Sequence, residues 1–220
     1  MSEPDTQTPS TRPRRQRTLK GLSFNRILPN ILTLLALCAG MTAIKFGFQD
    51  RWQAAAAAIA AAAILDALDG RVARLLKGSS KFGAELDSLS DVISFGVAPA
   101  IMMYLWALQD AGRFAWILAL VFAACCAMRL ARFNTLLDDP DAPAWKANFF
   151  TGVPAPAGAG LVLLPMVVSF QIGDGIARST EVASATMIIV STLLVSRVPT
   201  LSFKRLKVSR DWFMPTMVLV

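Results

Sequence analysis

Four aspartates stand at helical spacing in or next to apolar stretches of the chain. Asp66 and Asp69 are three residues apart and Asp87 and Asp91 are four apart, so each pair would lie on one face of a helix. A carboxylate at the centre of a membrane helix costs roughly 2.5–3.5 kcal/mol, which makes such acids functional candidates. Carboxylate oxygens suit hard cations such as Mg²⁺ and Mn²⁺, and two ions sharing carboxylates suit phosphoryl transfer.

The chain contains no histidine, which narrows the chemistry further. Its absence excludes serine–histidine and cysteine–histidine nucleophiles, histidine proton shuttles, and zinc or iron sites built on imidazole. Cys38 stands alone and Cys125 and Cys126 are adjacent, so no CxxC pair or disulfide framework is visible. A bound metal must therefore use oxygen ligands, and a carboxylate is the available general base.

Small residues and one arginine lie between the aspartates. Gly70 and Ala73 have little or no side chain on the helix face expected to bind the metal. Gly83 likewise has no side chain one turn before Asp87. Arg74 adds a guanidinium, a planar fork that fits phosphate oxygens. Taken singly, small residues usually serve helix packing and a terminal arginine usually extends to the membrane surface. Together with the four acids, they predict a diphosphate ligand beside the metals.

The composition places these residues in a membrane protein. The chain has 220 residues, of which 55% are hydrophobic, and a mean hydropathy of +0.51. About 20 apolar residues cross a bilayer as a helix. We predict an all-α integral membrane protein with six transmembrane helices, at residues 28–48, 52–76, 85–107, 114–133, 151–172 and 182–201.

The remaining segments and the charge distribution predict the orientation. Residues 1–20 form a disordered basic tail, residues 21–203 the six-span domain, and residues 204–220 a second basic tail, while 17–27 suit an amphipathic surface helix. Eighteen of the 22 lysines and arginines fall on the side of the N-terminus. By the positive-inside rule both termini are cytoplasmic. The four aspartates lie toward that side, so we expect a cytoplasm-facing active site in a bacterial inner membrane.

The string from Asp66 to Asp91, DALDGRVARLLKGSSKFGAELDSLSD, resembles the full signature of the CDP-alcohol phosphotransferase family, D-x2-D-G-x2-A-R-x8-G-x3-D-x3-D. Further strings resemble the phosphatidylserine synthase branch of that family: Pro29, Asn30 and Thr33, RLARFN at 129–134, and GVPAPAGA at 152–159. The resemblance implies transfer of a phosphatidyl group from CDP-diacylglycerol to the hydroxyl of L-serine, with release of CMP. Nothing in the sequence demands a covalent intermediate, so we expect direct displacement.

The resemblance also implies roles for single residues. Two ions, Mg²⁺ or Mn²⁺, would be held by Asp66, Asp69, Asp87 and Asp91. Asp91 would also be the catalytic base. CDP-diacylglycerol would be bound by Asn30, Thr33, Gly70, Ala73, Arg74, Ser80 and Gly83. The family further suggests a homodimer in the lipid bilayer, and no nucleic acid is expected as a partner.

The acceptor alcohol is harder to infer. Arg129 and Arg132 share a helix face near the cytoplasmic side, and we hypothesise that at least one meets the serine carboxylate or the lipid diphosphate. Ordinary positive-inside anchoring explains them equally well. Glycerol 3-phosphate and inositol phosphate are alternative acceptors. A divalent-cation transporter is an alternative of another class, but it would not require Gly70, Ala73, Arg74 and Gly83 at these spacings.

Overall fold

The computed structural model describes residues 24–76, 80–137, 150–151, 153–173, 175–196 and 199–200. The predicted tails and most of the predicted surface helix lie outside these ranges. The described part is helical except for one pair of two-residue strands, β1 (Phe150–Thr151) and β2 (Pro199–Thr200). The longer helices are α1 (Phe24–Gly47), α2 (Trp52–Leu75), α3 (Lys81–Asp91), α5 (Arg113–Leu137) and α8 (Thr180–Val195).

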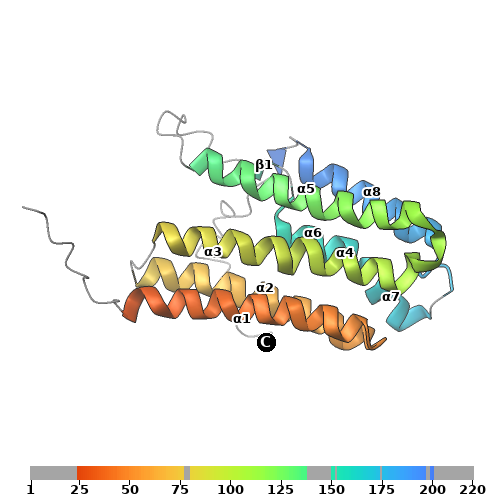
Figure 1. The fold of residues 1–220 in the computed structure, drawn as a ribbon, viewed down its shortest axis with the longest axis horizontal. Coiled ribbons are helices and arrows are strands. Elements are labelled where there is room, and N and C mark those ends of the chain that lie inside the picture. Colours follow the sequence, from red (N-terminus) through yellow and green to blue (C-terminus); the bar gives the residue numbers. More distant parts are fainter. Residues whose placement is uncertain are drawn as a thin grey trace, which may run out of the picture.

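Helices α1 and α2 form an antiparallel hairpin that packs along most of its length (Figure 1). The turn between them contains Asp50 with a φ of 56°, a left-handed conformation that aspartate tolerates better than most residues. The alanine-rich half of α2 turns Ala55, Ile59 and Ala62 into the core. Small side chains let helix backbones approach closely, which explains the tight pairing with α1.

The central element runs from α3 through η1 (Val92–Val97), α4 (Ala98–Met103), η2 (Tyr104–Leu108) and η3 (Gln109–Ala111). It lies between the α1–α2 hairpin and the layer of α5 and α8 (Figure 1). Turns η1 and η2 are π-helical. Pro99, near the start of α4, lacks a backbone N–H, which disturbs the hydrogen-bond ladder beside η1.

Two glycines allow this element to approach its neighbours closely. A Cβ atom on Gly40 of α1 would lie 2.5 Å from Ser94 Oγ and 2.8 Å from Ser94 Cα. A Cβ atom on Gly96 would lie 3.2 Å from Cys126 Cβ of α5. The central element is therefore held between α1 and α5 at a separation that only glycine permits at Gly40.

The C-terminal part differs from the predicted spans in two places. The predicted helix at 151–172 is two helices, α6 (Ala155–Val162) and α7 (Leu164–Ile172), which separate at Leu163 just before Pro165. The predicted helix at 182–201 is wrong at its end, because α8 stops at Val195 and residues 199–200 pair with β1. Proline cannot continue a helix, and the residue before it is also disfavoured in helical conformation, so Pro199 is incompatible with a helix that runs to residue 201.

Within the described residues, four helical stretches are long and apolar enough to cross a membrane: Ile27–Gly47, Lys81–Ala111, Arg113–Thr135 and Ala155–Ile172. Two further predicted spans correspond to α2, which carries Asp66 and Asp69, and α8, which has 16 residues. The all-helical architecture and the membrane class are thus supported. The number of six spans and the orientation stay predictions.

Candidate active site

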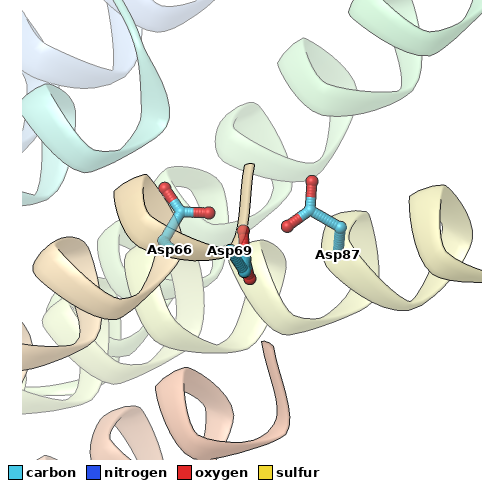
Figure 2. A group of neighbouring side chains, drawn as sticks. All are labelled: Asp66, Asp69 and Asp87. Carbon is cyan, nitrogen blue, oxygen red and sulfur yellow. The ribbon is translucent and has the colours of Figure 1, made fainter. Parts of the chain in front are cut away.

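Three carboxyl groups meet where α2 ends and α3 begins. Asp66, Asp69 and Asp87 each offer an oxygen, and these oxygens all lie within 4.8 Å of one another. Figure 2 shows Asp66 and Asp69 projecting from α2 and Asp87 from α3. Asp69 is only 4% exposed. The fold therefore brings Asp87 next to two acids that lie 18 and 21 residues earlier in the sequence.

Asp91, one turn after Asp87, joins the cluster through Asp66. The carboxyl groups of Asp66 and Asp91 lie at hydrogen-bonding range, and both side chains are partly buried. All four predicted metal ligands thus form one connected group. The structure shows that the four carboxyl groups lie close together. Their role as metal ligands stays a prediction.

The cluster fits a divalent cation. Asp87 Oδ1 is buried and has no hydrogen-bond partner among the described residues. A buried acceptor without a partner is destabilising, and like charges at this range repel one another unless a cation or a proton intervenes. The donor set is made of carboxylate oxygens alone, which suits Mg²⁺ or Mn²⁺ rather than a softer metal.

Hydrogen bonds from the first helix orient this cluster. Thr33 Oγ1 donates to Asp69 Oδ2 at 2.7 Å and also lies 3.1 Å from the carbonyl oxygen of Pro29. Ser90 Oγ donates to the carbonyl oxygen of Thr33 at 3.2 Å. One turn later, Ser94 Oγ donates to the carbonyl oxygen of Ala36 at 3.3 Å. These bonds tie α1, α2 and the central element together at the level of the aspartates.

The sequence interpretation did not assign Ser88, Ser90, Ser94 or Asn134 to the site. Asn134 Nδ2 of α5 donates to Ser88 Oγ of α3 at 2.8 Å, between Asp87 and Asp91. The sequence did contain a signal for two of these residues, because Ser90 and Ser94 are four positions apart and flank Asp91. Their partners are backbone carbonyls of α1, which no sequence pattern identifies.

A cavity of about 170 Å³ opens beside the cluster. Its lining contains two of the metal-ligand candidates and six of the residues expected to bind the nucleotide lipid. The lining residues are Pro29, Asn30, Thr33, Asp69, Gly70, Ala73, Ser80, Gly83, Ala84 and Asp87. The predicted nucleotide residues from three separate segments therefore surround one space next to the carboxylates.

The two motif glycines have different surroundings. A Cβ atom on Gly70 would meet no heavy atom within 4 Å, so this glycine borders open space. A Cβ atom on Gly83 would lie 3.0 Å from Asn30 Oδ1 and 3.2 Å from Ser80 Oγ. Gly70 thus leaves room for a ligand, whereas Gly83 lets α1 and α3 approach each other at the cavity wall.

Ser80 and Arg74 depart from their expected contacts. Ser80 Oγ caps α3 by accepting a hydrogen bond from the backbone N–H of Gly83 at 3.0 Å, while the residue also lines the cavity. Arg74 is exposed on the last turn of α2 and is absent from the cavity lining. Its contact with a diphosphate stays a prediction.

The two candidate acceptor arginines line a different cavity. Arg129 and Arg132 border a space of about 220 Å³ between α5 and α8, together with four apolar side chains. Arg129 lies within electrostatic range of Asp91, and its Nε is buried without a hydrogen-bond partner among the described residues. Arg129 therefore lies near Asp91, and neither arginine lines the glycine-lined cavity.

Comparison with known proteins identifies the family. The family model for CDP-alcohol phosphatidyltransferase matches residues 26–198. A relative from Mycobacterium leprae, named CDP-diacylglycerol–serine O-phosphatidyltransferase, is 45% identical over 86% of this chain and 62% of its own length. A Mycobacterium bovis protein of the same name is 47% identical over 79% of this chain and 60% of its own length. The chain therefore covers about three fifths of these mycobacterial relatives.

A more distant relative extends the match. The Helicobacter pylori protein of the same name is 34% identical over 88% of this chain and 78% of its own length. The family match includes both helices that carry the aspartates and the arginine-bearing end of α5. With the carboxylate cluster and the adjoining cavity, the comparisons show that this chain belongs to the CDP-alcohol phosphatidyltransferase family.

Proposed function

We propose that this protein transfers the phosphatidyl group of CDP-diacylglycerol to the hydroxyl of L-serine, which yields phosphatidylserine and CMP. The observation that carries the proposal is the cluster of Asp66, Asp69 and Asp87 at the wall of a cavity lined by Gly70 and Gly83. Membership in the family supports the reaction type, and the names of three relatives support serine as the acceptor.

The aspartates would hold two divalent ions, Mg²⁺ or Mn²⁺. Asp66, Asp69 and Asp87 would bind one, and Asp66, Asp87 and Asp91 the other. Such ions, when bound, neutralise the diphosphate and stabilise the negative charge that develops on the departing CMP. The chain's own contribution is to fix the carboxylates, which Thr33 does directly for Asp69.

The cavity would hold the cytidine diphosphate head. Gly70 and Ala73 leave its floor open, and Asn30 presents an amide group at its wall. Arg74, exposed at the end of α2, would move onto the diphosphate when the nucleotide binds.

Asp91 would act as the general base. It would take the proton of the serine hydroxyl as that oxygen attacks the phosphorus bonded to diacylglycerol. The new oxygen–phosphorus bond forms while the bond from that phosphorus to the CMP oxygen breaks, and CMP leaves with the bonding electron pair. Arg129, within electrostatic range of Asp91, places positive charge on the side where an acceptor would approach.

The family and the charge distribution support a membrane arrangement as well. We propose six spans with both termini and the aspartates on the cytoplasmic side of a bacterial inner membrane, and a homodimer as the working form. A cysteine placed at Ser80, in a variant without the three native cysteines, should react with an impermeant thiol reagent only after the cell is opened. A cysteine at Arg113, at the opposite end of the helices, should react in intact cells.

An acceptor panel tests the function itself. Purified protein receives CDP-diacylglycerol and Mn²⁺ with serine, glycerol 3-phosphate, inositol phosphate or choline, and CMP release is measured. Release with serine alone supports the proposal. CMP release with glycerol 3-phosphate or inositol phosphate would instead assign the protein to another branch of the family. Metal uptake without CMP release for any acceptor would favour a cation transporter instead.

A further inference from the structure

Two cavities between α5 and α8 form one groove. The first, of about 220 Å³, is lined by Arg129 and Arg132 and by four apolar side chains. The second, of about 470 Å³, extends along the same two helices past Leu118, Val121 and Ile188. Met128 and Val195 line both spaces, so the two cavities adjoin along the helices and are treated as one groove. The groove is mostly apolar, with the hydroxyl groups of Ser191, Thr192 and Ser196 on its α8 side, and it is cationic at one end.

The groove offers little to a small polar ligand. The hydroxyl of Thr192, which also lines it, already donates to the carbonyl oxygen of Ile188 at 2.8 Å. Several lining side chains are apolar and substantially exposed, including Met128 at 55% and Ile188 at 53%. Between two helices of a membrane protein, such a groove suits a hydrocarbon chain, because most of its lining is apolar and the hydroxyl groups of Thr192 and Ser196 already donate to backbone carbonyl oxygens.

The cationic end of the groove contains a hydrogen-bond donor that no protein acceptor satisfies among the described residues. Arg129 Nε is buried and has no hydrogen-bond partner among the described residues. A guanidinium in a mostly apolar cavity is unfavourable unless it is paired. A ligand with an anionic head and an apolar tail would satisfy both ends of the groove at once, which neither free serine nor a neutral lipid does.

We infer that this groove holds the phosphatidylserine product, with one acyl chain between α5 and α8 and the anionic headgroup on Arg129 and Arg132. The inference rests on the proposed function. Arg129 lies within electrostatic range of Asp91, so the headgroup end of the groove adjoins the reaction centre rather than a remote part of the surface. The product would leave sideways into the bilayer while CMP leaves by the glycine-lined cavity on the other side.

Two neighbouring isoleucines of α8 provide a matched test. Ile188 lines the groove, whereas Ile189 is outside its lining, and the two are 53% and 58% exposed. Ile188→Trp should fill the channel, and Ile189→Trp should leave it open. Native mass spectrometry of the full chain then measures retained phosphatidylserine, phosphatidylglycerol and phosphatidylcholine. We expect severalfold less phosphatidylserine on Ile188→Trp than on Ile189→Trp, and little phosphatidylcholine on any variant.

Kinetics separate product release from chemistry. With the groove filled, a single turnover of CMP release from CDP-diacylglycerol and serine should keep its rate, while steady-state turnover falls severalfold because release becomes limiting. Equal lipid retention and equal turnover in the two tryptophan variants would overturn the inference. So would equal retention of phosphatidylglycerol and phosphatidylserine by the unsubstituted protein, since the groove would then not select the product. If serine gave no CMP at all, the proposed function would fail instead, which the single-turnover measurement shows separately.

Discussion

The hydroxyl of Thr33 on α1 donates a hydrogen bond of 2.7 Å to Asp69 Oδ2 on α2, and both residues are 4% exposed. This bond fixes the position of the Asp69 carboxyl group beside those of Asp66 and Asp87. Groups that hold a metal ligand in position commonly change metal affinity about 10–100-fold when removed. Thr33 therefore connects the first helix to the proposed metal site.

Thr33→Val should weaken Mn²⁺ binding about tenfold, within the range for groups that support metal ligands. The measurement is a titration of free Mn²⁺ by electron paramagnetic resonance, without lipid substrate. Thr33→Ser should restore the affinity because it keeps the hydroxyl. Thr42→Val is the matched control, since Thr42 Oγ1 makes the corresponding bond to the carbonyl oxygen of Cys38 but is exposed and far from the aspartates. Equal Mn²⁺ affinities in all variants would contradict a positioning role.

Asp91→Asn should lower CMP release by about 10²–10⁴-fold, the usual contribution of a general base. It should spare CMP binding better than Asp66→Asn, because Asp66 belongs to the set of three close carboxylates and Asp91 does not. Calorimetric titration with CMP and Mn²⁺ measures binding for each variant. If Asp91→Asn lost CMP binding as completely as Asp66→Asn, the main role of Asp91 would be to bind the metal rather than to act as the base.

Gly70→Ala should weaken CMP binding without destabilising the protein. Its new Cβ would meet no protein atom within 4 Å but would protrude at the cavity lining. Alanine in a helix interior is favoured over glycine by about 0.5–1 kcal/mol, so the melting temperature should hold or rise slightly. Gly160→Ala on α6, whose Cβ also meets nothing within 4 Å, should give the same thermal behaviour with unchanged CMP binding. Equal CMP affinities in the two variants would remove Gly70 from the nucleotide site.

Gly40→Ala should destabilise the fold. The added Cβ would lie 2.8 Å from Ser94 Cα, and backbone cannot move aside as a flexible side chain can. Overpacking of this kind costs roughly 1–3 kcal/mol. The melting temperature in detergent, compared with that of Gly160→Ala, measures the effect. An unchanged melting temperature would mean that α1 and the central element can move apart to accept the added Cβ without a loss of stability.

Chelation provides a test of the metal requirement. Removing divalent ions should abolish CMP release, and adding Mg²⁺ or Mn²⁺ should restore it, because the clustered carboxylates repel one another when no cation is bound. The protein should also melt at a higher temperature with Mn²⁺ than with chelator, since a ligand that binds only the folded state stabilises it. Full activity in chelator would contradict the metal role of the aspartates.

The sequence by itself determined the chemistry and the approximate elements. Aspartates at positions 66, 69, 87 and 91, together with the glycines between them, predict a carboxylate site beside a phosphate ligand. The apolar stretches predict helices, and the missing histidine leaves carboxylates as the expected metal ligands and general base. Local periodicity is sufficient for these predictions, since it determines which residues share one face of a single helix.

Only the tertiary structure decided how those faces meet. Spacing along α2 and α3 does not reveal that Ser90 bonds to the backbone of Thr33, or that Arg129 and Arg132 border a groove with α8 rather than the glycine-lined cavity. The end of α8 at Val195 likewise depended on the strand pairing of residues 199–200. Rotation and axial shift between helices are set by close contacts such as Gly40 against Ser94, which involve residues more than 50 positions apart and leave no pattern in the sequence.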